Sequence, residues 1–183
     1  MKKKKIKSVL QILAIIACLC LGGYSYIVYE RTIINWWLPV ASGVLAASAS
    51  APFLSSYWKF FTASSQMWTN VFCHVFFTGI LVYSFILIGN KEFPGSQNKH
   101  ETVVSVVERE MVKRNTYRRV GRHRYVANGH RYDYYLVIAT DGGNKKRLPV
   151  SHYEYSRARN GSSITAMMQQ GFFGYPVITG LKN

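Results

Sequence analysis

Residues 8–29 have the sequence SVLQILAIIACLCLGGYSYIVY, which contains no charged side chain. A run of this length can cross the hydrocarbon core of a bilayer as an α-helix, which needs about 20 apolar residues. Five lysines precede it, namely Lys2, Lys3, Lys4, Lys5 and Lys7. Because basic residues next to a span stay on the cytoplasmic side, the sequence predicts a first membrane helix over residues 8–29 and a cytoplasmic N-terminus.

Two further apolar runs predict membrane helices over residues 33–54 and 67–88. The aromatic segment 55–66 between them is expected to lie as a loop in the cytoplasmic interface. Three crossings from a cytoplasmic N-terminus place residues 91–183 outside the inner membrane of a bacterium, in the periplasm. An alternative is cleavage before Cys18, because residues 15–18 resemble a lipobox. That processing leaves two crossings from an outside start and the same placement.

The composition changes near residue 90, and this change defines the predicted domains. Residues 91–183 contain 16 Lys and Arg against 7 Asp and Glu, a net charge of +9. We therefore predict a transmembrane region over 1–90, a linker over 91–100 and a soluble basic β domain over 101–183. All three cysteines lie in the first region, so a disulfide framework in the β domain is excluded.

Turn signals, one of them at residues 141–144, divide residues 101–183 into about six short strands and one helix. Asn128-Gly129 favours a two-residue type I′ hairpin, which would set Tyr125 opposite Tyr132 and Arg124 opposite Asp133. Ser151 and Glu154 form a capping box and predict a short helix over residues 152–159. The predicted fold is a three-helix membrane segment followed by a small antiparallel β domain, either a curled sheet or an open barrel.

The end of the chain, residues 158–178, is ARNGSSITAMMQQGFFGYPVI. This pattern of turn glycines resembles the C-terminal β modules of uncharacterised small bacterial inner-membrane proteins that have a few transmembrane helices. The resemblance covers about the last 80 residues, and it implies a fold without implying an activity.

Polar residues inside the third span form one candidate site. Asn70, His74 and Thr78 share one helix face at spacings of four residues. Ionisable groups inside a membrane are functional candidates by default. The alternative is a neutral His74 imidazole that hydrogen-bonds serines of the second span and bridges two helices.

Small residues form a stripe in the second span, where Gly43, Ala47 and Ala51 repeat every four residues. Such stripes allow the backbones of two helices to approach closely. One interpretation is a seam for a homo-oligomer, and the other is packing against the helices of the same chain.

A basic and aromatic patch is the candidate binding site of the β domain. Its residues are Arg118, Arg119, Arg122, Arg124, Arg131, Tyr125 and Tyr132. A solvated basic face, a surface for anionic lipids or another envelope polyanion, and a nucleic-acid interface are the three interpretations. The last requires the domain in the cytoplasm, so no nucleic acid is expected.

No catalytic or metal-binding constellation is recognisable in the sequence, and no cofactor is predicted. We expect a non-catalytic, membrane-anchored binding module of the bacterial envelope whose partners are the lipid bilayer and a protein or an anionic envelope component. An immunity-type protein or a small subunit of a membrane complex would have the same pattern. An enzyme or metal-binding protein that uses His74 is the alternative of another class.

Overall fold

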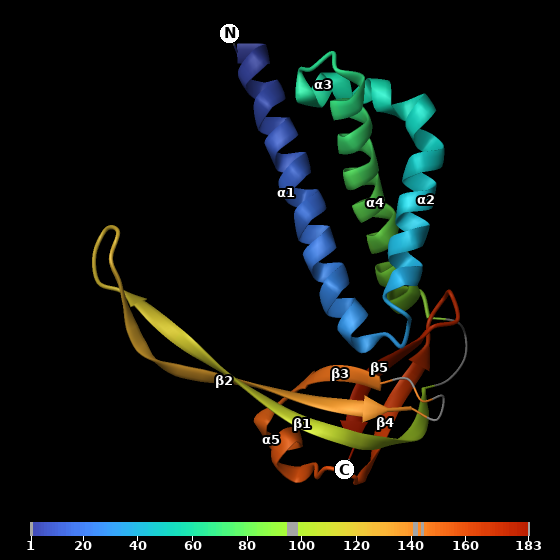
Figure 1. Ribbon diagram of the computed structural model, residues 1–183, viewed down its shortest axis with the longest axis vertical. Helices are drawn as coiled ribbons and strands as arrows, with labels where there is room; N and C mark the ends of the chain where they lie inside the picture. The colour runs from blue at the N-terminus through green and yellow to red at the C-terminus, as the bar shows by residue number, and fades with distance from the viewer. Residues whose placement is uncertain (1, 95–98, 141–142, 144, 183) are drawn as a thin grey trace. The chain divides into compact units, whose positions relative to one another are not determined.

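The computed structural model describes residues 2–94, 99–140, 143 and 145–182, with side chains described from residue 8 onward (Figure 1). The chain divides into two compact units. The helical unit comprises Met1–Asn98 together with Gln170–Val177, and the β unit comprises Lys99–Gln169 and Ile178–Asn183. The lysine side chains before residue 8, part of the predicted linker and most of the predicted turn at residues 141–144 lie outside the described residues.

The helical unit contains the three long helices that the sequence predicts. They are α1 (Lys2–Arg31), α2 (Trp37–Leu54) and α4 (Met67–Glu92). Each is long and apolar enough to cross a membrane. The expected loop 55–66 is largely helical instead, with η1 (Ser55–Trp58) and α3 (Lys59–Thr62). The Trp58 ring stacks on the Phe77 ring of α4 at 5.2 Å between centroids, which holds this segment in a compact turn.

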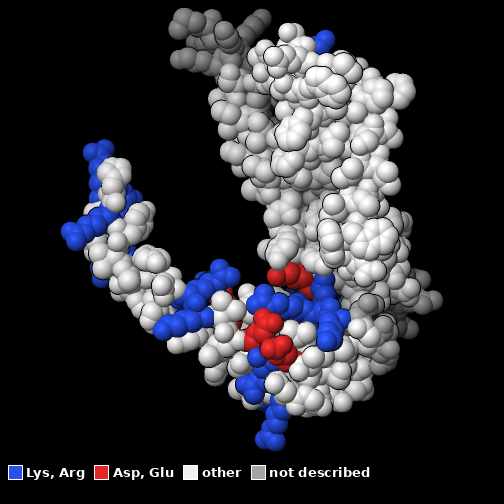
Figure 2. All heavy atoms as spheres, viewed as in Figure 1, with Lys and Arg blue, Asp and Glu red and all other residues white. Residues whose placement is uncertain are grey.

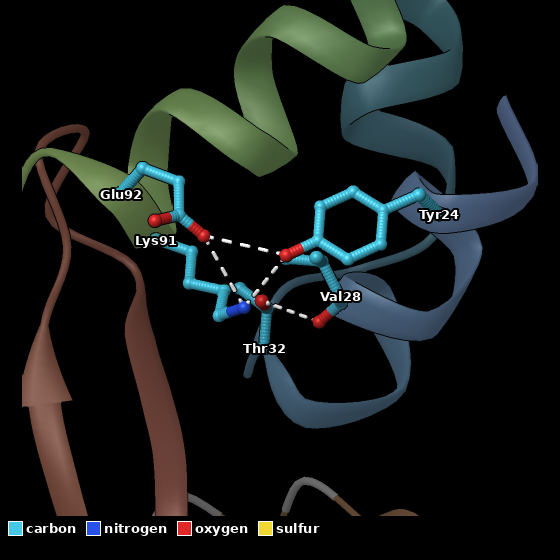
Figure 3. A network of polar contacts seen from close by, with 5 residues as sticks. All are labelled: Tyr24, Val28, Thr32, Lys91 and Glu92. Carbon is cyan, nitrogen blue, oxygen red and sulfur yellow. Dashed lines mark hydrogen bonds and ion pairs between the residues drawn. The ribbon is translucent and has the colours of Figure 1, made fainter. Parts of the chain in front are cut away.

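Polar contacts join α1 to the last turn of α4 (Figure 3). The Lys91 Nζ donates to the Tyr24 hydroxyl at 2.9 Å and lies 3.3 Å from a Glu92 carboxylate oxygen. The Tyr24 hydroxyl in turn donates to the same carboxylate at 3.3 Å. One turn beyond this network, the Thr32 hydroxyl donates a hydrogen bond to the Val28 carbonyl at 2.8 Å. The network therefore ties the ends of two spans together through exposed groups.

The β unit is built on a five-stranded antiparallel sheet with the order β3-β2-β1-β4-β5. Its strands are β1 (His100–Arg119), β2 (Tyr125–Ala139), β3 (Lys145–Val150), β4 (Ser163–Gln170) and β5 (Pro176–Lys182). The sheet is open and does not close into a barrel, which settles the choice that the sequence left between these two forms. The buried side chains of its core include Val104, Val106, Leu136, Ile138 and Leu148.

The hairpin predicted at Asn128-Gly129 is wrong. The predicted number of about six strands is wrong for the same reason. The described residues contain five strands, because β2 runs through Asn128-Gly129 without turning. Both residues instead lie opposite Thr116 of β1, between the pairs Asn115↔His130 and Tyr117↔Ala127. This is a β-bulge, and Gly129 takes there the positive φ of 93° that a side chain would oppose.

A short helix, α5 (His152–Arg157), packs on β2 of the same unit. The predicted capping box is confirmed, because the Glu154 amide donates to the Ser151 hydroxyl and the Ser151 amide donates to the Glu154 carboxylate. The Tyr155 ring of α5 lies 4.9 Å from the Tyr134 ring of β2, measured between centroids. The helix therefore covers the face of the sheet on which Tyr134 lies.

Candidate functional site

The outer halves of β1 and β2 form a two-stranded arm, which we define as residues 111–133. β4 pairs with β1 only over His100–Ser105, and β3 pairs with β2 only over Tyr134–Ala139. Every residue from 117 to 132 is exposed. Figure 1 shows the arm as the long twisted extension of β1 and β2. A two-stranded ribbon of this kind has no hydrophobic core of its own, so its side chains are free to contact a ligand.

Local contacts hold the two strands of the arm together. The Thr116 hydroxyl donates to the Asn128 carbonyl at 2.8 Å, across the bulge. His130 Nδ1 and Asn115 Oδ1 lie 2.9 Å apart on a neighbouring pair. The strongly exposed ribbon is therefore stabilised by cross-strand polar pairs more than by burial.

The arm is strongly basic, and part of its charge is paired. Seven lysines and arginines stand against one carboxylate, that of Asp133. Asp133 lies 2.6 Å from Arg114 Nε and 3.1 Å from Arg131 Nε. The sequence-based register set Arg124 opposite Asp133, and this is wrong because the strands pair around a different turn.

Arg119 closes that turn. Its guanidinium donates to the carbonyl oxygens of Gly121 and Arg122 at 2.9 and 2.6 Å. Among the described residues, the remaining cations of the arm have neither an ion pair nor a side-chain hydrogen bond; they are Lys113, Arg118, Arg122 and Arg124. In Figure 2 the lysines and arginines of the arm appear as separated blue groups, with uncharged side chains between them.

The two faces of the arm differ, because side chains alternate along each strand and cross-strand partners share a face. Tyr125 pairs with Arg119, and Tyr132 pairs with Lys113. Together with Tyr117 these residues form the tyrosine face, on which the three tyrosines are 63%, 64% and 41% exposed for residues 117, 125 and 132. The two tyrosines that the sequence set opposite each other thus share a face without being partners.

The opposite face of the arm is the arginine face. It contains Arg114, Arg118 and Arg131, while Arg122 and Arg124 lie in the turn between the strands. The predicted basic and aromatic patch is therefore brought onto one arm, but it is split between two faces and a tip. Such a ribbon can contact an extended or flat anionic ligand from either side.

The intramembrane polar residues have a different arrangement. His74 is buried, and its Nδ1 accepts a hydrogen bond from the Trp58 indole N–H at 3.0 Å. An indole can only donate, so we assign the ring proton to Nε2, which lies 2.9 Å from the Ser50 hydroxyl. The Ser50 hydroxyl in turn donates a hydrogen bond to the Ala46 carbonyl at 2.9 Å. The structure thus gives His74 the serine partner that the helix-bridging interpretation predicts.

The neighbours of His74 on the same helix face are also engaged. Asn70 accepts from the Thr62 hydroxyl at 2.7 Å and donates to the Ser64 carbonyl at 3.1 Å. The Thr78 hydroxyl lies 3.4 Å from His74 Nδ1. Within the described part of the chain, no group of three or more His, Cys, Asp or Glu side chains could hold a metal ion. The printed contacts of these residues join α4 to α2 and to the segment that contains η1 and α3.

The stripe of small residues in α2 faces α4 of the same unit. Gly43, Ala47 and Ala51 are all buried. A Cβ atom built on Gly43 would lie 2.8 Å from the carbonyl oxygen of Gly79. The stripe is therefore occupied by an intramolecular partner, as the second interpretation of this pattern predicts.

Sequence reasoning missed the polar contact of Asn90, in the last turn of α4, with residues 171–175. The only signal available was a polar amide at the end of an apolar run.

Comparison of the chain with protein-family models, curated proteins and solved structures finds no match. The function therefore has to be inferred from the chemistry of the chain, and among the described residues the arm groups several cations that are not used in ion pairs inside the protein.

Proposed function

We propose that the chain is a non-catalytic, membrane-anchored binding module whose arm binds an anionic component of the bacterial envelope. The observation that carries this proposal is the arm itself, in which cations without a described acceptor lie on a ribbon whose residues 117–132 are all exposed. A ribbon of this kind stabilises no core, and its excess positive charge favours anionic ligands.

Charge and aromatic rings together support phosphate-rich ligands. Each lysine or arginine near an anionic membrane surface contributes about 1 kcal/mol of attraction. Tyrosine side chains combine an apolar ring with a polar hydroxyl, which suits the boundary between headgroups and water. The tyrosine face provides three such rings beside Lys113 and Arg119.

We further propose that the N-terminus lies in the cytoplasm and the β unit in the periplasm, with the three helices in the inner membrane. The lysines at the start of the chain and the odd number of spans support this orientation. Reporters fused after Asn183 test it, since alkaline phosphatase is active only outside the cytoplasm. If the phosphatase fusion is inactive while a fusion to a reporter that fluoresces only in the cytoplasm is fluorescent, the proposed orientation is contradicted.

The binding proposal is tested with the full chain in nanodiscs of phosphatidylcholine. The probes are fluorescent polyphosphate and vesicles that contain phosphatidylglycerol, with phosphatidylcholine vesicles as the uncharged reference. We expect affinity that falls as salt rises, because exposed charges are screened. In the triple variant Arg118→Gln, Arg122→Gln and Arg124→Gln, the loss of about 3 kcal/mol weakens binding on the order of 100-fold.

A matched control separates the arm from the net charge of the chain. The triple variant Lys99→Gln, Lys145→Gln and Arg159→Gln removes the same number of charges from exposed positions outside the arm. It is expected to bind nearly as the parent does. Absence of binding to both anionic probes, or an equal loss in the two triple variants, contradicts the proposal.

A further inference from the structure

The turn between β4 and β5, residues 171–175, belongs to the helical unit. We name it the Phe-Phe turn after Phe172 and Phe173. It is fixed to Asn90, whose side chain is fully buried in the last turn of α4. The Phe172 amide donates to the Asn90 backbone carbonyl at 3.1 Å, and the Phe173 amide donates to its side-chain oxygen at 3.0 Å.

The attachment is completed on the other side of the turn. The Asn90 amide nitrogen donates to the Tyr175 carbonyl at 2.9 Å, so every hydrogen-bonding atom of this side-chain amide except one proton has a partner in the turn. A Cβ atom on Gly171 would lie 2.2 Å from that nitrogen, and therefore only glycine allows the approach. The Ile33 amide, just after α1, also donates to the Pro176 carbonyl at 2.8 Å. The turn is thus held to the end of α4, and Pro176, which follows it, is held to the segment just after α1.

The Phe173 ring lies against α4, near Phe85 and Gly89. The Phe173 ring is 6.0 Å from the Phe85 ring between centroids, and it lies 3.6 Å from the position of a Cβ on Gly89. Phe85 precedes Asn90 by five residues, about 7.5 Å along the axis at the rise of an α-helix. The Phe173 ring therefore points back along the span toward its apolar middle.

The surface that these rings extend is the exposed surface of a candidate membrane span. Phe85 is 66% exposed within the span Met67–Glu92. Phe172 is 64% exposed, and its ring makes an edge contact with the Phe173 ring at 5.1 Å. Exposed Phe side chains of segments that lie in the membrane interface are buried at the boundary between headgroups and acyl chains.

We propose that the Phe-Phe turn is a lipid-contact site, in which Phe172 and Phe173 insert into the bilayer boundary beside the end of α4. The occupant is the lipid that surrounds the span, because the Phe173 ring contacts the exposed Phe85 of the span and the exposed Phe172 ring contacts Phe173. The turn anchors the chain to the membrane at a point far from the spans in sequence. This inference does not depend on the ligand of the arm.

A site-directed fluorophore tests the proposal in the full chain. Cys18, Cys20 and Cys73 are replaced by alanine, and Phe172→Cys is labelled with an environment-sensitive dye. The substitution leaves the attachment intact, because Asn90 binds the amide of residue 172 and not its ring. The protein is reconstituted in phosphatidylcholine vesicles, and quenching is measured with lipids that carry a doxyl group near the headgroup and with aqueous iodide.

The same dye at Phe85→Cys sets the value for a lipid-facing position, and labelled free cysteine sets the value for water. We expect the doxyl-to-iodide quenching ratio at position 172 to lie closer to that of position 85. Asn90→Asp, which keeps the shape but removes the donor to Tyr175, is expected to shift the ratio toward iodide. A ratio closer to free cysteine overturns the proposal. A label that neither quencher reaches also overturns it, because the turn is then covered by protein, such as a second copy.

Discussion

Replacing Gly43 with alanine is expected to destabilise the helical unit, because the added methyl group meets backbone and not a movable side chain. The built Cβ lies 2.8 Å from the Gly79 carbonyl oxygen, whereas an ordinary van der Waals contact begins at 3.4 Å. The two helices must therefore separate by about 0.6 Å at this contact. Overpacking of this kind costs about 1–3 kcal/mol of unfolding free energy.

The same contact provides its own control. A Cβ on Gly79 would lie 3.9 Å from the Gly43 carbonyl oxygen, so Gly79→Ala fits without movement. Both variants gain the same helix propensity, up to about 1 kcal/mol, and this gain cancels in their difference. Unfolding by sodium dodecyl sulfate in mixed micelles, followed by circular dichroism, should rank Gly43→Ala below Gly79→Ala by about 1–3 kcal/mol. Equal stability of the two variants would refute the asymmetric packing on which this reasoning depends.

Two other substitutions test the helical unit and the arm. Trp58→Phe removes the hydrogen-bond donor to His74 Nδ1. It should lower the free energy of unfolding by about 1 kcal/mol in the same assay, near the lower end of the penalty for an unpaired buried group. The control is Trp68→Phe, at a position that is 81% exposed, which should not change the free energy of unfolding measurably. Gly129→Ala opposes a φ of 93° and should cost about 1–2 kcal/mol, seen as faster hydrogen exchange of the arm amides. No change in exchange would show that the bulge does not constrain the arm.

The three spans could be predicted from the sequence because the length of an apolar run is a local property. The capping box of Ser151 and Glu154 is local in the same way, and the structure reproduces both of its hydrogen bonds. The serine partner of His74 could also be anticipated, since a buried imidazole in a span needs a polar neighbour. In each case, the prediction depended on residues within one element or on a strong physical need.

The course of the arm could not be predicted from local pattern. Asn128-Gly129 suits a type I′ turn, but a glycine with positive φ suits a bulge equally well. The choice was decided by long-range pairing, because β1 pairs with β2 from Ser105↔Ala139 as far as Arg119↔Tyr125. The same register decides which cations of the arm form ion pairs, so these pairs could not be predicted either. Asp133 pairs with Arg114 and Arg131, and not with Arg124 as the predicted hairpin required.

The contact between Asn90 and the Phe-Phe turn has a consequence for the order of assembly during translation. Asn90 and Phe173 are separated by 83 positions along the chain. A ribosome that adds about 5–20 residues per second needs roughly 4–17 s to cover that distance. During this interval α4 has been synthesised, but the Asn90 side chain still lacks its hydrogen-bond partners, the backbone groups of Phe173 and Tyr175. The helical unit therefore reaches its finished form only after β1, β2, β3 and β4 have been synthesised.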